Sequence, residues 1–145
     1  MPQSRGESEE EVVAKIAHPV ADIAAQTRGV RFQHIGRLIT RDGWRIASHA
    51  HPRCYELLVI YSGRHRAQIG REAVLSEAGG ALLYPPKCIH SERTLGPHTE
   101  WAYASFEWPS APPDLPTRLT DTTGRARMMG DWLLAEERLM QPARQ

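Results

Sequence analysis

The most restrictive feature of this sequence is a run of short apolar segments between Val30 and Trp108, each ended by a turn signal. The segments are rich in β-branched and aromatic residues, which favour strands. Glycines and prolines interrupt them, as at Gly79-Gly80 and Pro85-Pro86. We expect strands over residues 30–40, 44–50, 55–62, 65–70, 72–76, 81–85, 90–95 and 100–108. So many short antiparallel strands indicate a mainly β sandwich, jelly roll or barrel.

The 145-residue chain divides into three parts by composition. Residues 1–29 start with an acidic stretch and predict a partly disordered or helical arm, which Pro19 interrupts. Residues 30–108 hold the strands and predict the barrel. Residues 109–145 predict a proline-rich connection and then a C-terminal helical segment from Thr120 to Met140. Five apolar residues of that segment approximate one stripe, which would either cover the barrel or form a dimer face: Met128, Met129, Trp132, Leu133 and Leu139.

Charge and hydropathy exclude several classes of protein. The chain has 18 basic and 17 acidic residues and a formal net charge of +1, so it lacks the electrostatic signature of a nucleic-acid-binding domain. No apolar run approaches the ~20 residues of a membrane-spanning helix, and the N-terminus has no apolar signal core. We therefore predict a cytoplasmic protein without membrane contact. Cys54 and Cys88 make no disulfide framework and would be reduced in the cytoplasm.

The stretch GWRIASHAHPRCYELLVIYSG, from Gly43 to Gly63, gathers three potential metal ligands. His49 and His51 lie two residues apart, so on a strand their side chains point to the same face. Pro52 ends that strand, and the following turn allows Glu56 to face the same cavity. A second stretch, GGALLYPPKCIH, ends at a fourth candidate, His90. Zinc, nickel, iron and manganese accept such mixed ligands, although paired histidines can also hydrogen-bond at a barrel mouth without any metal.

Together these two stretches resemble the cupin superfamily. Its first motif reads Gly, five residues, His-x-His, three or four residues, Glu, six residues, Gly, and Gly43 to Gly63 fills every fixed position. In the second motif Lys87 stands where glycine is usual and Thr94 where asparagine is usual. The resemblance implies a cupin-type antiparallel β-barrel, or jelly roll, followed by one or more C-terminal helices. It also implies a divalent metal ion as cofactor, with the ligands His49, His51, Glu56 and His90.

The resemblance extends to the N-terminal effector-binding, or sensor, domain of AraC-type transcriptional regulators. This resemblance rests on the His-x-His, the strand YELLVIYSG, a hairpin turned at glycine, the GGALLYPP segment, and the aromatic strand WAYASFEW. This likeness implies a domain that binds a small-molecule or metal effector and forms a homodimer. It would reach DNA only through a C-terminal helix-turn-helix domain, which we do not find in this sequence, so the chain would be a sensor cut from a longer regulator or a stand-alone relative.

Other side chains have a functional and a purely structural interpretation. Five of them are candidates for contact with an effector, although such residues often only fill a core: Trp44, Tyr55, Tyr84, Cys88 and Trp101. Four further histidines lack a partner pattern and are predicted to be surface or hydrogen-bonded residues: His18, His34, His65 and His98. Two alternatives to a sensor are a small cupin metalloenzyme, of dioxygenase or isomerase type, and a non-catalytic cupin that binds a metal or a sugar. The sequence offers no acid or base beyond the ligands, which favours a protein that is not an enzyme.

Overall fold

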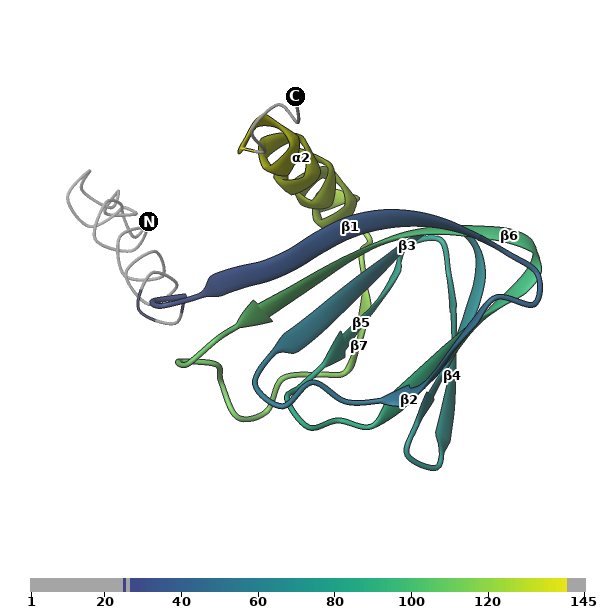
Figure 1. Ribbon diagram of the computed structural model, residues 1–145, viewed down its shortest axis with the longest axis horizontal. Coiled ribbons are helices and arrows are strands. Elements are labelled where there is room, and N and C mark those ends of the chain that lie inside the picture. The colour runs from purple at the N-terminus through teal and green to yellow at the C-terminus, as the bar shows by residue number, and fades with distance from the viewer. Residues whose placement is uncertain (1–24, 26, 141–145) are drawn as a thin grey trace, which may run out of the picture.

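The computed structural model describes residue 25 and residues 27–140 of the chain, and Figure 1 shows their arrangement. The elements are β1 (Arg31–Arg41), β2 (Arg45–His49), β3 (Tyr55–Ile69), β4 (Glu72–Glu77), β5 (Gly80–Tyr84), β6 (His90–Glu107), β7 (Arg118–Thr120) and α2 (Arg125–Met140). All strand pairs are antiparallel. The predicted mainly β architecture with a C-terminal helix is therefore confirmed. No helix in residues 27–140 has the length and apolar character needed to cross a membrane.

Two long strands, β3 and β6, belong to both layers of the barrel. The first half of β3 pairs with β5 and with the second half of β6, which in turn pairs with β1. The second half of β3 pairs with β4 and with the first half of β6, whose other neighbour is β2. β3 changes direction at Gly63, which has a φ of 80° and whose missing Cβ would lie 2.3 Å from the carbonyl oxygen of His98. Because both strands bend, one sheet folds over on itself and encloses a core (Figure 1).

Three boundaries differ from those predicted from the sequence. Gly63 and Gly96-Pro97 were expected to end strands, but β3 and β6 run through them and bend there, because their partners continue to pair on both sides. The helix starts at Arg125 rather than at Thr120. A short strand, β7, ends at Thr120, where the helix was predicted to start, and pairs with β5 at the edge of the sheet. The sequence analysis did not predict β7, because the prolines before it are poor strand formers.

The core lies between the two layers, and the strand YELLVIY is buried on both faces. Leu58 and Ile60 point inward and pack with Leu82 and Trp101. The alternate residues, including Val59 and Tyr61, form a second cluster on the outer face with Ala81, Ala102 and the helical Ala126. A strand that is covered on both faces has a continuous run of apolar residues instead of an alternating pattern, and LLVIY in this strand is such a run.

The helix α2 contacts the barrel through one row of residues and exposes another. Leu134 is 8% exposed, and a Cβ at Gly130 would lie 2.9 Å from the hydroxyl oxygen of Tyr61. That hydroxyl donates to Oδ1 of Asp131 over 3.2 Å. Met128, Met129 and Trp132 of the predicted stripe are 45%, 57% and 63% exposed. These three side chains therefore do not cover the barrel. Of the two predicted roles of the stripe, the dimer face is the one that their exposure allows.

Candidate metal centre

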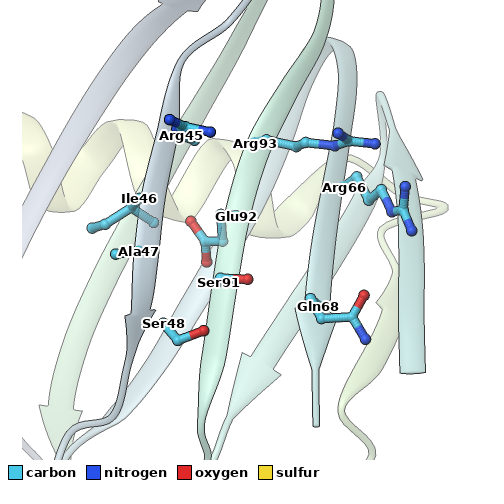
Figure 2. A pocket seen from close by; sticks show the side chains of 9 residues that line it. All are labelled: Arg45, Ile46, Ala47, Ser48, Arg66, Gln68, Ser91, Glu92 and Arg93. Carbon is cyan, nitrogen blue, oxygen red and sulfur yellow. The ribbon is translucent and has the colours of Figure 1, made fainter. Parts of the chain in front are cut away.

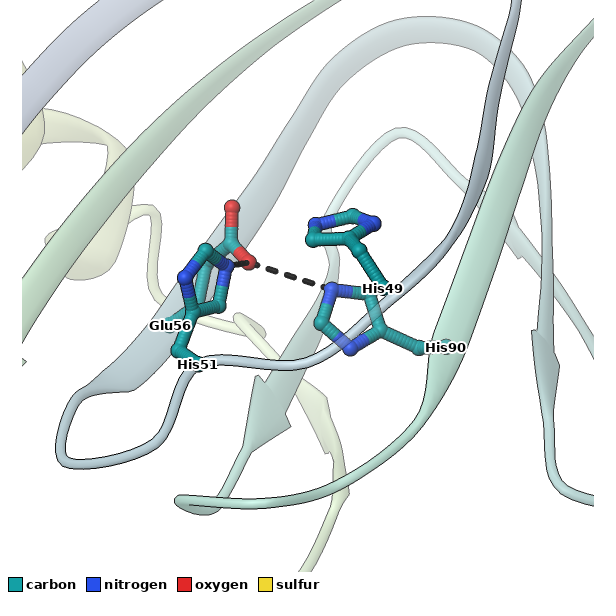
Figure 3. Close-up of side chains that lie close together, drawn as sticks. All are labelled: His49, His51, Glu56 and His90. Carbon is teal, nitrogen blue, oxygen red and sulfur yellow. Dashed lines mark hydrogen bonds and ion pairs between the residues drawn. The ribbon is translucent and has the colours of Figure 1, made fainter.

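The four residues predicted as metal ligands lie together at one end of the barrel. One ligand atom from each of His49, His51, Glu56 and His90 lies within 4.8 Å of the others. His49 ends β2, Glu56 is near the start of β3, and His90 starts β6. Figure 3 shows the rings of His51 and His90 pointing toward the carboxylate of Glu56, with the ring of His49 above His90. Segments separated by up to 41 positions therefore supply one compact group of donors.

Strand pairing places two of the imidazoles, and a loop places the third. His49 and His90 are direct partners in the β2–β6 ladder, and their ring centroids lie 4.3 Å apart. β2 ends at His49, so His51 lies in the following loop rather than on the same strand as predicted. Its ring nevertheless reaches the group, with its centroid 5.1 Å from that of His49. The β2–β6 register already shifts between Ile46 and His49, so the ladder becomes irregular before Pro52 rather than at it, as was predicted.

Hydrogen bonds to the backbone orient the rings. Nδ1 of His49 donates to the carbonyl oxygen of Ala47 over 2.9 Å, which leaves Nε2 of the neutral ring free to accept. Nδ1 of His90 donates in the same way to the carbonyl oxygen of Cys88 over 3.0 Å. Such contacts fix the tautomer of a metal-binding histidine and aim its other nitrogen at the ion. The arrangement therefore fits a metal bound through Nε2 atoms.

Glu56 is the electrostatic centre of the group. Its Oε2 accepts a hydrogen bond from Nε2 of His51 over 2.8 Å, and it accepts one from Nε2 of His90 over 3.2 Å when the His90 ring carries a proton on both nitrogens. Burial opposes ionisation of this carboxyl, but the bonds and charges of the two histidines outweigh it and lower the pKa of Glu56. Burial likewise opposes protonation of His90, yet the bond to Glu56 and the bond to the Cys88 carbonyl raise the pKa of His90. A metal ion would replace the protons that now lie between these donors.

Lys87 occupies the turn that precedes His90 in a left-handed conformation, with a φ of 67°. This is the position at which the second motif departs from glycine, and it is the only non-glycine residue with positive φ in the described part of the chain. The turn closes with a bond of 3.1 Å from the Cys88 amide to the Pro85 carbonyl. Lysine can adopt this backbone only with some strain, so the departure changes the stability of the turn and not its shape.

Four of the five candidate effector contacts surround the same interior. Tyr84 stacks on His90 with a centroid distance of 3.9 Å, and Trp44 meets Trp101 edge to face at 5.5 Å. Cys88 is partly buried against the same apolar cluster, and burial raises the pKa of its thiol. The thiol is not one of the clustered donor groups. Tyr55 lies apart, because it packs against Phe106 and Trp108 on the outer face.

The sequence did not reveal a second polar group inside the barrel. His65 was predicted to be a surface or hydrogen-bonded residue, but it is 0% exposed and neither ring nitrogen has a hydrogen-bond partner among the described residues. Its Nε2 lies 3.6 Å from Oε2 of Glu92, which is also buried. Within the part of the chain that the structure describes, the buried Tyr84 hydroxyl also has no hydrogen-bond partner. The alternation of His65, Ala67 and Ile69 along β3 was the available signal that His65 points inward.

Comparisons with solved structures agree with this fold. The protein YhaK from Escherichia coli is 20% identical over 66% of this chain and 44% of its own, with a TM-score of 0.54. A predicted oxalate decarboxylase from Thermotoga maritima is 15% identical over 60% of this chain and 72% of its own, with a TM-score of 0.50. A cupin-2 domain containing protein from Shewanella frigidimarina is 11% identical over 61% of this chain and 89% of its own, with a TM-score of 0.44. At such identities the likeness concerns the fold alone.

The chain folds into an antiparallel β-barrel that gathers four potential metal ligands at one end. A family model described as the AraC-like ligand binding domain matches residues 32–142. The chain belongs to this family, as its motifs predicted. No curated protein sequence matches it significantly.

Proposed function

We propose that this chain is the effector-sensing and dimerisation domain of an AraC-type transcriptional regulator, and that His49, His51, Glu56 and His90 hold a divalent metal ion. The observation that carries the metal site is the convergence of the four donors within 4.8 Å at the barrel mouth. A metal there would act either as the effector itself or as an anchor for a small molecule. Zinc, nickel, iron and manganese all suit three imidazoles and a carboxylate.

The same strand links this site to the helix. β3 carries Glu56 near its start and Tyr61 five positions later, and the Tyr61 hydroxyl contacts Asp131 of α2. A ligand regulates only if it binds one arrangement of barrel and helix more tightly than another. We propose that the effector shifts the docking of α2, and that residues 109–145 lead toward the helix-turn-helix domain of the whole regulator. The exposed Met128, Met129 and Trp132 support a dimer contact on the outer face of α2.

Elemental analysis tests the metal site. Protein purified without chelators should contain about one metal per chain, and the double variant His49→Ala/His51→Ala should contain little. The matched control is His34→Ala/His98→Ala, which removes two histidines that are exposed on β1 and β6. Retention of the full metal content by the first double variant would contradict the site. A thermal-shift series with the four metals would then rank the candidates, since a ligand of the folded state raises its stability.

A cupin metalloenzyme is the second candidate. Three imidazoles and one carboxylate leave open positions on a six-coordinate iron or manganese, as such an enzyme requires. The two candidates differ in what happens to a bound molecule. A metabolite that stabilises the metal-loaded protein should be recovered unchanged by mass spectrometry if the domain is a sensor, and converted if it is an enzyme.

A further inference from the structure

The outer face of the barrel carries three arginines in one row, on the side of the sheet opposite to the metal centre. Arg93 of β6 is the direct ladder partner of Arg45 on β2 and of Arg66 on β3. Strand neighbours lie about 4.8 Å apart, so three guanidinium groups start from adjacent positions. Figure 2 shows the three side chains at the same level across the neighbouring strands.

None of the three arginines has an acidic partner among the described residues. Within residues 27–140 none of the ion pairs includes Arg45, Arg66 or Arg93, whereas Arg64 on the same face pairs with Glu77. Like charges placed directly opposite each other across a ladder destabilise a sheet. A row of this kind is therefore stabilised when an anion binds between its members. The three neighbouring positive charges therefore point to an anionic ligand.

The row borders a groove of about 740 Å³. The β2–β6 register shifts between Ile46 and His49, and Ala47 and Ser48 of this irregular stretch line the groove. Ser48, Gln68 and Ser91 add hydroxyl and amide groups to the lining. The volume falls within the ~300–1,000 Å³ that small-molecule sites usually have.

Glu92 is the one carboxylate among the lining residues. Its side chain is only 4% exposed, and its Oε2 lies toward the buried ring of His65. The charges that meet solvent in the groove therefore belong to the arginines. Guanidinium groups bind phosphates and carboxylates through paired hydrogen bonds, which gives both affinity and orientation.

We propose that this groove is a second ligand site, which binds a small molecule with two or more anionic groups, either phosphoryl or carboxylate. Arg93 lies at its centre, and Arg45 and Arg66 hold the two ends of the ligand. An anion shared by Arg45 and Arg93 ties β2 to β6, and these strands continue to His49 and His90. The site is distinct from the metal centre, so the two proposals can be tested separately and the failure of one leaves the other unaffected.

Calorimetric titration of the full chain tests the proposal with two probes, pyrophosphate and tricarballylate. The titrations use metal-depleted His49→Ala/His51→Ala protein at pH 8 and fixed ionic strength, because both probes would otherwise bind to a metal in the barrel. We expect saturable binding of one equivalent of at least one probe. The tighter of the two probes identifies the phosphoryl or the carboxylate class.

Charge-matched variants separate a built site from general attraction. Arg93→Gln should weaken binding by about tenfold or more, which corresponds to about 1.4 kcal/mol. Arg28→Gln removes the same charge from an exposed position before β1 and should leave binding unchanged. Without probe, Arg93→Gln should melt at the same or a higher temperature than its parent, because a like-charge contact is removed. A lower melting temperature would show that Arg93 has a structural role instead.

Three further outcomes would overturn the proposal. One is the absence of saturable binding for both probes. Another is an equal loss of affinity in Arg93→Gln and Arg28→Gln, since net charge alone would then account for it. The third is binding of a random-sequence DNA duplex that depends on Arg93 while neither small anion binds, because the row would then contact nucleic acid.

Discussion

The backbone amide of Lys87 donates a hydrogen bond of 2.7 Å to the backbone carbonyl of His51. This bond joins the loop that holds one predicted ligand to the turn that leads to another, His90. The two motif stretches are therefore connected by the backbone as well as by their side chains. The geometry of the candidate metal centre depends on the left-handed turn at Lys87, which has a φ of 67°.

Substitutions at Lys87 should change stability in the order set by this backbone conformation. Lys87→Gly removes the steric cost of positive φ but adds freedom to the unfolded chain, so we expect a gain of about 0.5–1 kcal/mol. Lys87→Val should lose about 1 kcal/mol or more, because a β-branched residue tolerates this conformation poorly. Urea unfolding of both variants, with Lys87→Asn as an intermediate, measures the order. Equal stability of the valine and glycine variants would show that the turn does not need positive φ.

Glu56 is expected to contribute most of the charge that holds a metal ion. Glu56→Gln keeps the shape of the side chain but removes the negative charge, so metal affinity should fall by at least about tenfold, or about 1.4 kcal/mol. Glu72→Gln, which removes an exposed carboxylate of β4, is the control and should have no effect. Competition with a chromogenic chelator at constant pH measures both. An unchanged affinity in Glu56→Gln would leave the histidines as the whole site and remove the carboxylate from it.

The clustered donors could be predicted because each of them lies within a short motif of fixed spacing. His49, His51 and Glu56 fall within eight residues, and His90 ends a second recognisable stretch. The pair of His65 and Glu92 could not be predicted in this way. These residues meet only because the second half of β3 pairs with the first half of β6. The alternation along β3 indicates that His65 points inward, but no local pattern records its pairing with Glu92.

The positions of the strands were predicted more accurately from the sequence than the points at which the strands end. Glycine signals at Gly63 and Gly96 are real, since both residues have positive φ. A turn signal reports only the local backbone, however, and the ladder between β3 and β6 continues on either side of Gly63. Likewise, β7 has three residues and follows several prolines, so its pairing with β5 is a tertiary effect that local propensity does not contain.

The docking of α2 should weaken at high pH through Tyr61. Burial and the nearby carboxylate of Asp131 raise the pKa of Tyr61 to about 12, from an ordinary value of 10. The folded state therefore binds this proton more tightly than the unfolded state does. The resulting stability is fully present below pH 10 and is lost as the pH rises from 10 to about 12.

Urea unfolding at pH 8, 10 and 11.5 measures this contribution against a variant that lacks the hydroxyl. Tyr61→Phe should lose about 1 kcal/mol at pH 8, because the bond to Asp131 is gone. It should also lose less stability than the parent between pH 10 and 11.5. Tyr55→Phe is the control, because its ring lies in a separate apolar cluster. Parallel curves for Tyr61→Phe and its parent would show that the hydroxyl does not hold the helix.

Alanine substitutions at two residues of α2, two positions apart, should distinguish an effect on folding stability from an effect on dimerisation. Leu134 is 8% exposed against the barrel, so Leu134→Ala should lose about 2–3 kcal/mol of unfolding free energy. Trp132 is 63% exposed, so Trp132→Ala should change the stability of the monomer by no more than about 0.5 kcal/mol. If the outer face of α2 is the dimer contact, Trp132→Ala should instead raise the dimer dissociation constant by about tenfold or more, because exposed tryptophans are frequent hot spots. Sedimentation equilibrium measures this constant, and an unchanged value would place the dimer contact elsewhere on the domain.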